Sequence, residues 1–223
     1  MKKILNTKLV FVCFFIVLAL ASFIRLYRLD LVPSSPYWEE VALGYDAYSI
    51  LKTGADHHGN RFPIVAFESF GDWKPSLYFY AIVPAILLFD LSVTAIRLPA
   101  ALSGIVLVML IGYSAWMLAK TIWPQDTSKW MCSSLVALTV STFSPWLVLF
   151  SRGGWEVMLG TTLLFAGTLL GFQVIKEVED GKTAKKTEQL RINTTSLFFC
   201  VLLLILSLYA YHGTRMLAPL FGL

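Results

Sequence analysis

Apolar residues along this chain are gathered into long runs that are separated by short polar segments. Several runs approach the roughly 20 residues that an α-helix needs to cross a hydrocarbon core about 30 Å thick. They cover residues 9–26, 96–119, 130–150, 157–175 and 195–211. Because only helices and closed barrels satisfy their backbone inside a bilayer, the pattern predicts an all-α integral membrane protein, a multi-span helical bundle.

The first apolar run follows three lysines, so a secretory signal peptide is a competing interpretation. However, the run is long, continues through Ile24 to Leu26, and lacks a clear small-x-small cleavage site. These features favour an uncleaved spanning helix.

The segment 77–89 is apolar but shorter than a span, contains Pro84 and ends at Asp90. Its start, Tyr78-Phe79-Tyr80, is typical of the aromatic belt at a membrane–water interface. We therefore predict that this segment lies in the interface and does not cross the membrane.

Composition supports a bilayer environment, because 57% of the residues are hydrophobic and only 14% are charged. Soluble domains contain about 25% charged residues. The net charge of +4 is too small to indicate a nucleic-acid partner.

The distribution of charge predicts the orientation. If 77–89 does not cross, segments 1–8, 120–129 and 176–193 share one side and hold ten basic and five acidic residues. The opposite side then holds eight basic and nine acidic residues. Basic loops remain cytoplasmic, so we predict a multi-pass plasma-membrane protein with a cytoplasmic N-terminus. If 77–89 did cross, the basic loop 176–191 would lie outside.

This orientation makes residues 27–95 one long outer loop that contains juxtamembrane helices. The turns 151–156 and 211–215 lie on the same side. Almost every unusual polar residue of the chain is therefore expected at the outer face.

Adjacent carboxylates, Glu39 and Glu40, follow a proline-rich turn and begin a segment predicted to be helical through Tyr48. Acids at this position can simply stabilise a solvated helix N-terminus. Alternatively, one of them serves as a general base that accepts a proton from a hydroxyl. Asp46, farther along this segment, is a candidate for substrate binding.

Several other residues are candidates for binding a phosphorylated substrate. Lys74 begins the interfacial segment and is either a snorkelling lysine or a phosphate ligand. Arg215 suits bidentate phosphate binding. Arg152 and Glu156 lie in a short turn and can simply pair, but Glu156 begins an otherwise apolar helix, where an ionisable residue suggests a functional site.

The remaining polar motifs have simpler explanations. Asp56-His57-His58-Gly59 suggests a metal site, yet the following Gly59-Asn60 pair favours an exposed turn. His212 is explained as an interface histidine. The three cysteines lie in apolar runs without metal-ligand spacing. Asn193-Thr194-Thr195 matches a glycosylation acceptor but is expected in the cytoplasm.

In these motifs the chain resembles the protein O-mannosyltransferase and aminoarabinose transferase group of the GT-C glycosyltransferases. The resemblance covers nearly the whole chain and rests on an ordered set of short motifs. They are Trp38-Glu39-Glu40, Gly44-Tyr45-Asp46-Ala47-Tyr48, Leu51-Lys52-Thr53-Gly54, Lys74-Pro75-Ser76-Leu77-Tyr78, Arg97-Leu98-Pro99-Ala100-Ala101-Leu102-Ser103-Gly104, and Ser151-Arg152 with Glu156.

The resemblance implies a GT-C type bundle that transfers a mannose-like sugar from a polyprenyl-phosphate carrier to an acceptor protein, lipid or glycan, at the outer face and amid membrane lipids. The family's acidic pair, usually Asp-Glu, corresponds to Glu39-Glu40, with Glu39 the first choice for the base. Lys74-Pro75 matches the pair that holds the carrier phosphate. Glu156 takes the second acidic position, and a divalent cation is compatible with the site.

The resemblance also implies roles for other residues. Arg152 and Arg215 would assist Lys74 at the phosphate, and Asp46 and Tyr78 would contribute to substrate binding. Family members have more helices, so we expect 1–223 to be the N-terminal part of a longer domain. Two other interpretations stay open: a transporter or flippase for lipid-linked sugars, and a membrane scaffold whose charges only set topology.

Overall fold

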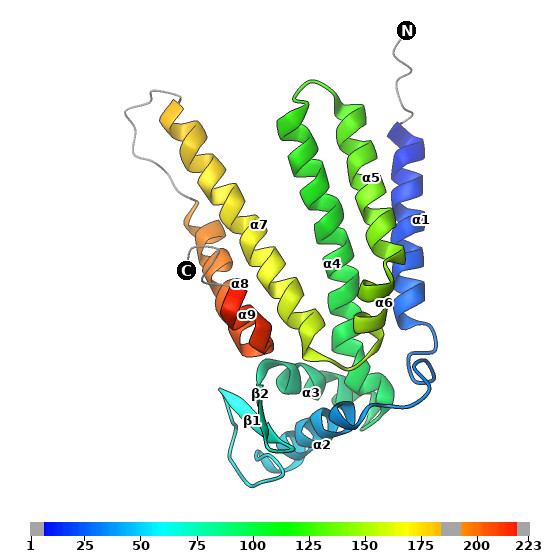
Figure 1. Cartoon of the computed structure of the whole chain (residues 1–223), viewed down its shortest axis with the longest axis vertical. Coiled ribbons are helices and arrows are strands. Elements are labelled where there is room, and N and C mark those ends of the chain that lie inside the picture. Colours follow the sequence, from blue (N-terminus) through cyan, green and yellow to red (C-terminus); the bar gives the residue numbers. More distant parts are fainter. Residues whose placement is uncertain (1–6, 184–192, 218–223) are drawn as a thin grey trace.

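The computed structural model describes residues 7–183 and 193–217. Its long helices run side by side along one axis (Figure 1). These helices are α1 (Thr7–Leu26), α4 (Val93–Ile122), α5 (Thr127–Phe143), α7 (Glu156–Thr183) and α8 (Thr194–Ala210). The shorter elements are α2 (Trp38–Thr53), β1 (Ala66–Ser69), β2 (Asp72–Pro75), α3 (Leu77–Phe89), α6 (Pro145–Arg152) and α9 (His212–Leu217).

Within the described part of the chain, three helices are long and apolar enough to cross a bilayer: Lys8–Leu26, Val93–Ile122 and Glu156–Glu179. A fourth candidate span consists of α5 and α6, which meet at a bend of 56°. The chain is therefore a mostly helical protein of the multi-pass membrane type.

Three details differ from the sequence-based expectations. The run 130–150 is not one straight helix, because α5 ends at Phe143 and Pro145, which has no backbone N–H, starts α6. The last expected span, 195–211, forms α8 with nearly the expected bounds, but at 17 residues it is shorter than the helices that qualify as candidate spans. The all-α expectation omitted a hairpin, in which β1 pairs antiparallel with β2.

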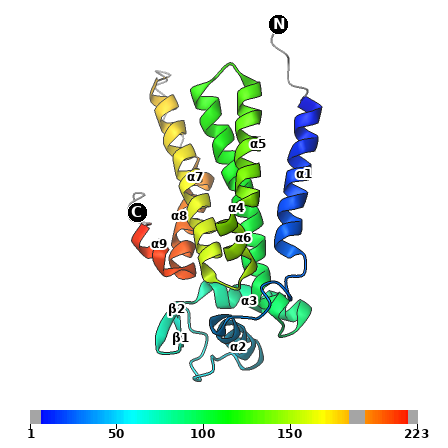
Figure 2. The same cartoon turned by 45° about the vertical axis from the view of Figure 1, so that its right-hand side comes forward.

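One end of the long helices carries α2, the hairpin and α3, as well as the α6–α7 and α8–α9 connections (Figures 1 and 2). The α4–α5 turn lies at the opposite end (Figure 1). This arrangement gathers the predicted outer segments at one end of the bundle. The basic residues expected within 1–6 and 184–192, and the apolar end at 218–223, lie outside the described residues.

A shared core fixes this end of the molecule to the bundle. Buried side chains of α2, β1, α3 and the start of α4 form one hydrophobic cluster. Within it, the rings of Phe67 and Phe79 stack with centroids 4.1 Å apart. Gly44 allows α2 to approach α4, since a Cβ there would lie 2.4 Å from the Ile96 side chain. The elements that carry the polar residues are thus positioned by packing.

Candidate functional site

An ion pair joins α2 to the hairpin. Lys74 Nζ donates to Glu39 Oε1 at 3.0 Å and lies 3.9 Å from Asp72 Oδ2. Glu39 belongs to the first turn of α2, where the helix dipole favours a carboxylate. The Lys74 side chain is only 10% exposed, whereas that of Glu39 is 32% exposed. The site therefore combines a largely buried cation with an accessible carboxylate.

The environment of Lys74 keeps its ammonium charged. Burial alone lowers the pKa of this lysine. The hydrogen bond to Glu39 and the negative charges of Glu156, Glu39 and Asp72 outweigh burial, so the pKa of Lys74 lies above its usual value. A cation held in this way is suited to binding an anionic group.

Two further elements reach the same region. Glu156 starts α7 and is close enough to interact electrostatically with Lys74, Glu39 and His212. His212, at the start of α9, lies with Nε2 2.5 Å from the carbonyl oxygen of Trp73. We call Glu39, Asp72, Lys74, Glu156 and His212 the Lys74 site. Four elements, α2, β2, α7 and α9, therefore contribute to it.

Glu40, adjacent to Glu39 in sequence, has a different environment. It is 2% exposed and pairs with Arg97 of α4, whose Nε and Nη2 donate to it at 3.1 and 3.0 Å. Its oxygens also accept the backbone N–H groups of Tyr37, at 2.9 Å, and Gly154. Glu40 thus links the start of α2, α4 and the α6–α7 turn.

Two arginines hold the connection between α1 and α2 through its carbonyl groups. Arg97 donates to the carbonyl oxygens of Leu29, Pro33 and Ser35. Arg152 donates to four further carbonyl oxygens, which belong to the end of α1 and to the connection. They are the carbonyl oxygens of Ile24, Tyr27, Arg28 and Val32. The guanidinium of Arg152, predicted to bind phosphate, is thus occupied by backbone carbonyls.

The other predicted binding residues form hydrogen bonds with partners outside the Lys74 site. Arg215 is exposed, and its Nε donates to Leu208 O at 2.9 Å. Tyr78 is fully buried, and its hydroxyl donates to Ile96 O at 2.9 Å. Asp46 is buried on α2 and pairs with His57, with 2.7 Å between Oδ1 and Nδ1. The structure therefore brings Glu39, Lys74 and Glu156 together, whereas the other predicted residues are engaged by different partners.

Sequence reasoning gave no role to Arg97, His57 or Asp72. The sequence could have singled out Arg97, because an ionisable residue in an otherwise apolar helix is a candidate for a functional or structural role. His57 was interpreted as part of an exposed loop, but its ring is held by Asp46. Over the described residues, no group of three or more His, Cys, Asp or Glu side chains is arranged to hold a metal ion.

Comparisons with protein-family models, with curated proteins and with solved structures find no match to this chain.

Proposed function

We propose that this protein is a membrane glycosyltransferase that moves a mannose-like sugar from a polyprenyl-phosphate carrier to an acceptor hydroxyl at the outer face, with inversion. The observation that carries the proposal is the pair formed by Glu39 and Lys74, 3.0 Å apart at one end of an apolar bundle. Such a transfer needs a general base and a cation for the leaving phosphate. The GT-C resemblance of the sequence supports the same reaction.

In the proposed step, the acceptor oxygen attacks the anomeric carbon while the bond from that carbon to the phosphate oxygen breaks. The acceptor proton passes to Glu39, and polyprenyl phosphate leaves with the bonding electron pair. Lys74 stabilises the charge that develops on the leaving oxygen through a charge-assisted hydrogen bond. Glu156 orients the acceptor or the sugar.

The ion pair also suggests how donor binding prepares the base. In the free protein Lys74 donates to Glu39 Oε1. The carrier phosphate would replace Glu39 as the hydrogen-bond partner of Lys74. Glu39 Oε1 would then be free to accept the proton of the acceptor hydroxyl. Binding of the donor would therefore activate Glu39.

The environments of the two adjacent acids favour Glu39 over Glu40 as the base. Glu40 is buried and already accepts hydrogen bonds from Arg97 and from two backbone N–H groups. A carboxylate that is buried and occupied in this way is poorly placed to contact a substrate hydroxyl. Glu40 is thus a positioning residue, and Glu39 is the proposed catalytic residue.

The proposed orientation is tested with reporter fusions. A reporter that is active only outside the cell, fused after Asp90, should be active, because Asp90 follows α3 at the end of the bundle that holds the Lys74 site. The same reporter after Asp126, in the turn between α4 and α5, should be inactive. Activity after Asp126 but not after Asp90 would contradict an outer-face site.

The proposed reaction is tested with membranes that contain the protein and a panel of labelled polyprenyl-phosphate sugars. We expect label to move to an acceptor, and Lys74→Ala to lower the turnover number about 100- to 1,000-fold, as loss of a transition-state donor does. Lys74→Arg should retain part of the activity. Lys52→Ala, at an exposed lysine of α2, is the matched control and should leave transfer unchanged.

The outcomes also separate the other two interpretations. A transporter would move the labelled carrier across the membrane without forming a labelled acceptor, and Lys74→Ala would slow that movement. A scaffold would give neither result, and substitutions at Lys74 would have no effect on either measurement. Either pattern would contradict the proposed transferase.

A further inference from the structure

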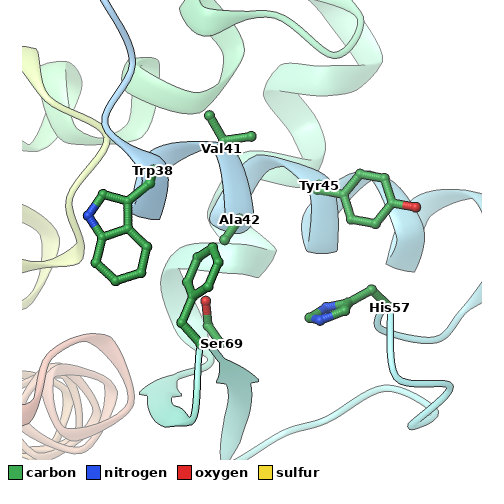
Figure 3. Close-up of a pocket in the computed structure, with 7 residues that line it drawn as sticks. Trp38, Val41, Ala42, Tyr45, His57 and Ser69 are labelled. Carbon is green, nitrogen blue, oxygen red and sulfur yellow. The ribbon is translucent and has the colours of Figure 1, made fainter.

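A second site lies between α2, the loop that follows it and the hairpin. It is a pocket of about 270 Å³. Its lining residues are Trp38, Val41, Ala42, Tyr45, His57, Ser69 and Phe70. Figure 3 shows Trp38, Val41, Ala42 and Tyr45 on α2, with His57 and Ser69 across from them. We call it the α2 pocket.

Aromatic rings form the two ends of the α2 pocket. Trp38 and Phe70 pack edge to face at one end, with centroids 4.4 Å apart. Tyr45 and His57 meet at the other end, 6.4 Å apart. Trp38, Tyr45 and Phe70 are each about half exposed or more. The exposed faces of these three rings can therefore pack against an apolar surface of a ligand.

Two hydrogen-bonding groups line the same pocket. Ser69 is 2% exposed, and its Oγ has no hydrogen-bond partner among the residues that the structure describes. His57 Nδ1 lies 2.7 Å from Asp46 Oδ1, which also accepts the backbone N–H of His57 at 2.9 Å. Because a carboxylate only accepts, Nδ1 carries the hydrogen and Nε2 remains available for a ligand.

The loop that carries His57 is held in place before any ligand binds. Asp56 is 4% exposed and accepts hydrogen bonds from the backbone of His58 and from the backbone and side chain of Asn60. These hydrogen bonds keep the pKa of Asp56 below its usual value, although burial alone raises it. A pre-organised wall lowers the entropic cost of binding.

We propose that the α2 pocket binds a neutral sugar ring. A pyranose has C–H faces that stack on aromatic rings and hydroxyl groups that can pair with Ser69 Oγ and His57 Nε2. A purely apolar ligand would leave Ser69 Oγ buried without a partner, which is unfavourable. An anion would be disfavoured by the negative charge of Asp46, which is buried and lies 2.7 Å from Nδ1 of the pocket residue His57.

The size of the pocket limits the ligand further. Pockets for drug-sized molecules have volumes of about 300–1,000 Å³, so about 270 Å³ suits a single ring. Neither Glu39 nor Lys74 lines the α2 pocket. Sugar binding at the α2 pocket and sugar transfer at the Lys74 site can therefore fail or succeed separately.

The test uses the purified protein in nanodiscs and methyl α-mannopyranoside, methyl β-galactopyranoside and methyl β-glucopyranoside as probes. Saturation-transfer NMR should show binding of at least one of them. Ser69→Ala should weaken that binding about 3- to 10-fold, as expected for one lost hydrogen bond. Trp38→Ala, which removes a stacking face, should weaken it about tenfold or more.

Trp146→Ala is the matched control, because Trp146 is an exposed tryptophan of α6 that does not line the α2 pocket; it should leave binding unchanged. Tetramethylammonium tests the alternative that the aromatic rings bind a cation. Saturable binding of this cation but of no glycoside would overturn the proposal. So would glycoside binding that is unchanged in both Ser69→Ala and Trp38→Ala.

Discussion

Replacing Glu39 with glutamine is expected to lower sugar transfer about 100- to 10,000-fold, the usual contribution of a general base. Glutamine keeps the size of the side chain and can still accept a hydrogen bond from Lys74, but it cannot take up the acceptor proton. The measurement is the rate of labelled product formation from a polyprenyl-phosphate sugar, with the donor and the acceptor both saturating. Under these conditions a change in rate reports a step that follows substrate binding.

Stability should change little in the Glu39→Gln variant. Glutamine still accepts a hydrogen bond from Lys74, and the negative charges of Asp72 and Glu156 remain near the largely buried ammonium. Glu68→Gln is the matched control, since Glu68 is a partly exposed acid of β1, 3.9 Å from His58. It should transfer sugar at the normal rate. Normal turnover in the Glu39→Gln variant would refute its assignment as the base.

Replacing Arg97 with methionine is expected to lower the free energy of unfolding by about 3–5 kcal/mol, because it leaves Glu40 buried without its charged partner. The same substitution removes the donors to the carbonyl groups of Leu29, Pro33 and Ser35. The connection between α1 and α2 would therefore lose contacts with α4. The effect should appear in stability before any substrate is added.

Cys200 provides the measurement, because it is 7% exposed in the folded protein. Its reaction with a thiol-reactive dye, followed as temperature rises, reports unfolding when Cys13→Ser and Cys132→Ser remove the other thiols. Arg215→Met, at an exposed arginine, is the matched control and should change stability by less than about 0.5 kcal/mol. Equal melting temperatures for Arg97→Met and Arg215→Met would contradict a stabilising role of the Glu40–Arg97 pair.

A double substitution separates the charge from the other contacts. In Glu40→Gln with Arg97→Met, neither side chain is charged, so no unpaired charge is buried. The loss of stability should then be smaller than the sum of the two single losses, as in pairs that interact directly. Additive losses would mean that Arg97 acts mainly through the backbone carbonyl groups.

The sequence alone determined where most of the apolar helices lie and that a short apolar helix precedes α4. The bounds of α3, Leu77–Phe89, are those predicted from the apolar run. This was possible because an apolar run is defined by consecutive residues, so its position can be identified without knowledge of tertiary contacts. The bend between α5 and α6 was also readable in principle, since Pro145 marks it.

Only the tertiary structure decided which charged residues meet. Glu39 and Glu40 are adjacent in sequence, yet one pairs with Lys74, 35 residues away, and the other with Arg97, 57 residues away. Successive helical residues point about 100° apart around the axis, so adjacent acids face different neighbours. Which neighbours these are depends on how α2 packs against α4 and the hairpin. The same packing places the guanidinium of Arg152 against backbone carbonyl groups and forms the α2 pocket, which His57 lines. Neither contact can be predicted from the residues adjacent in sequence.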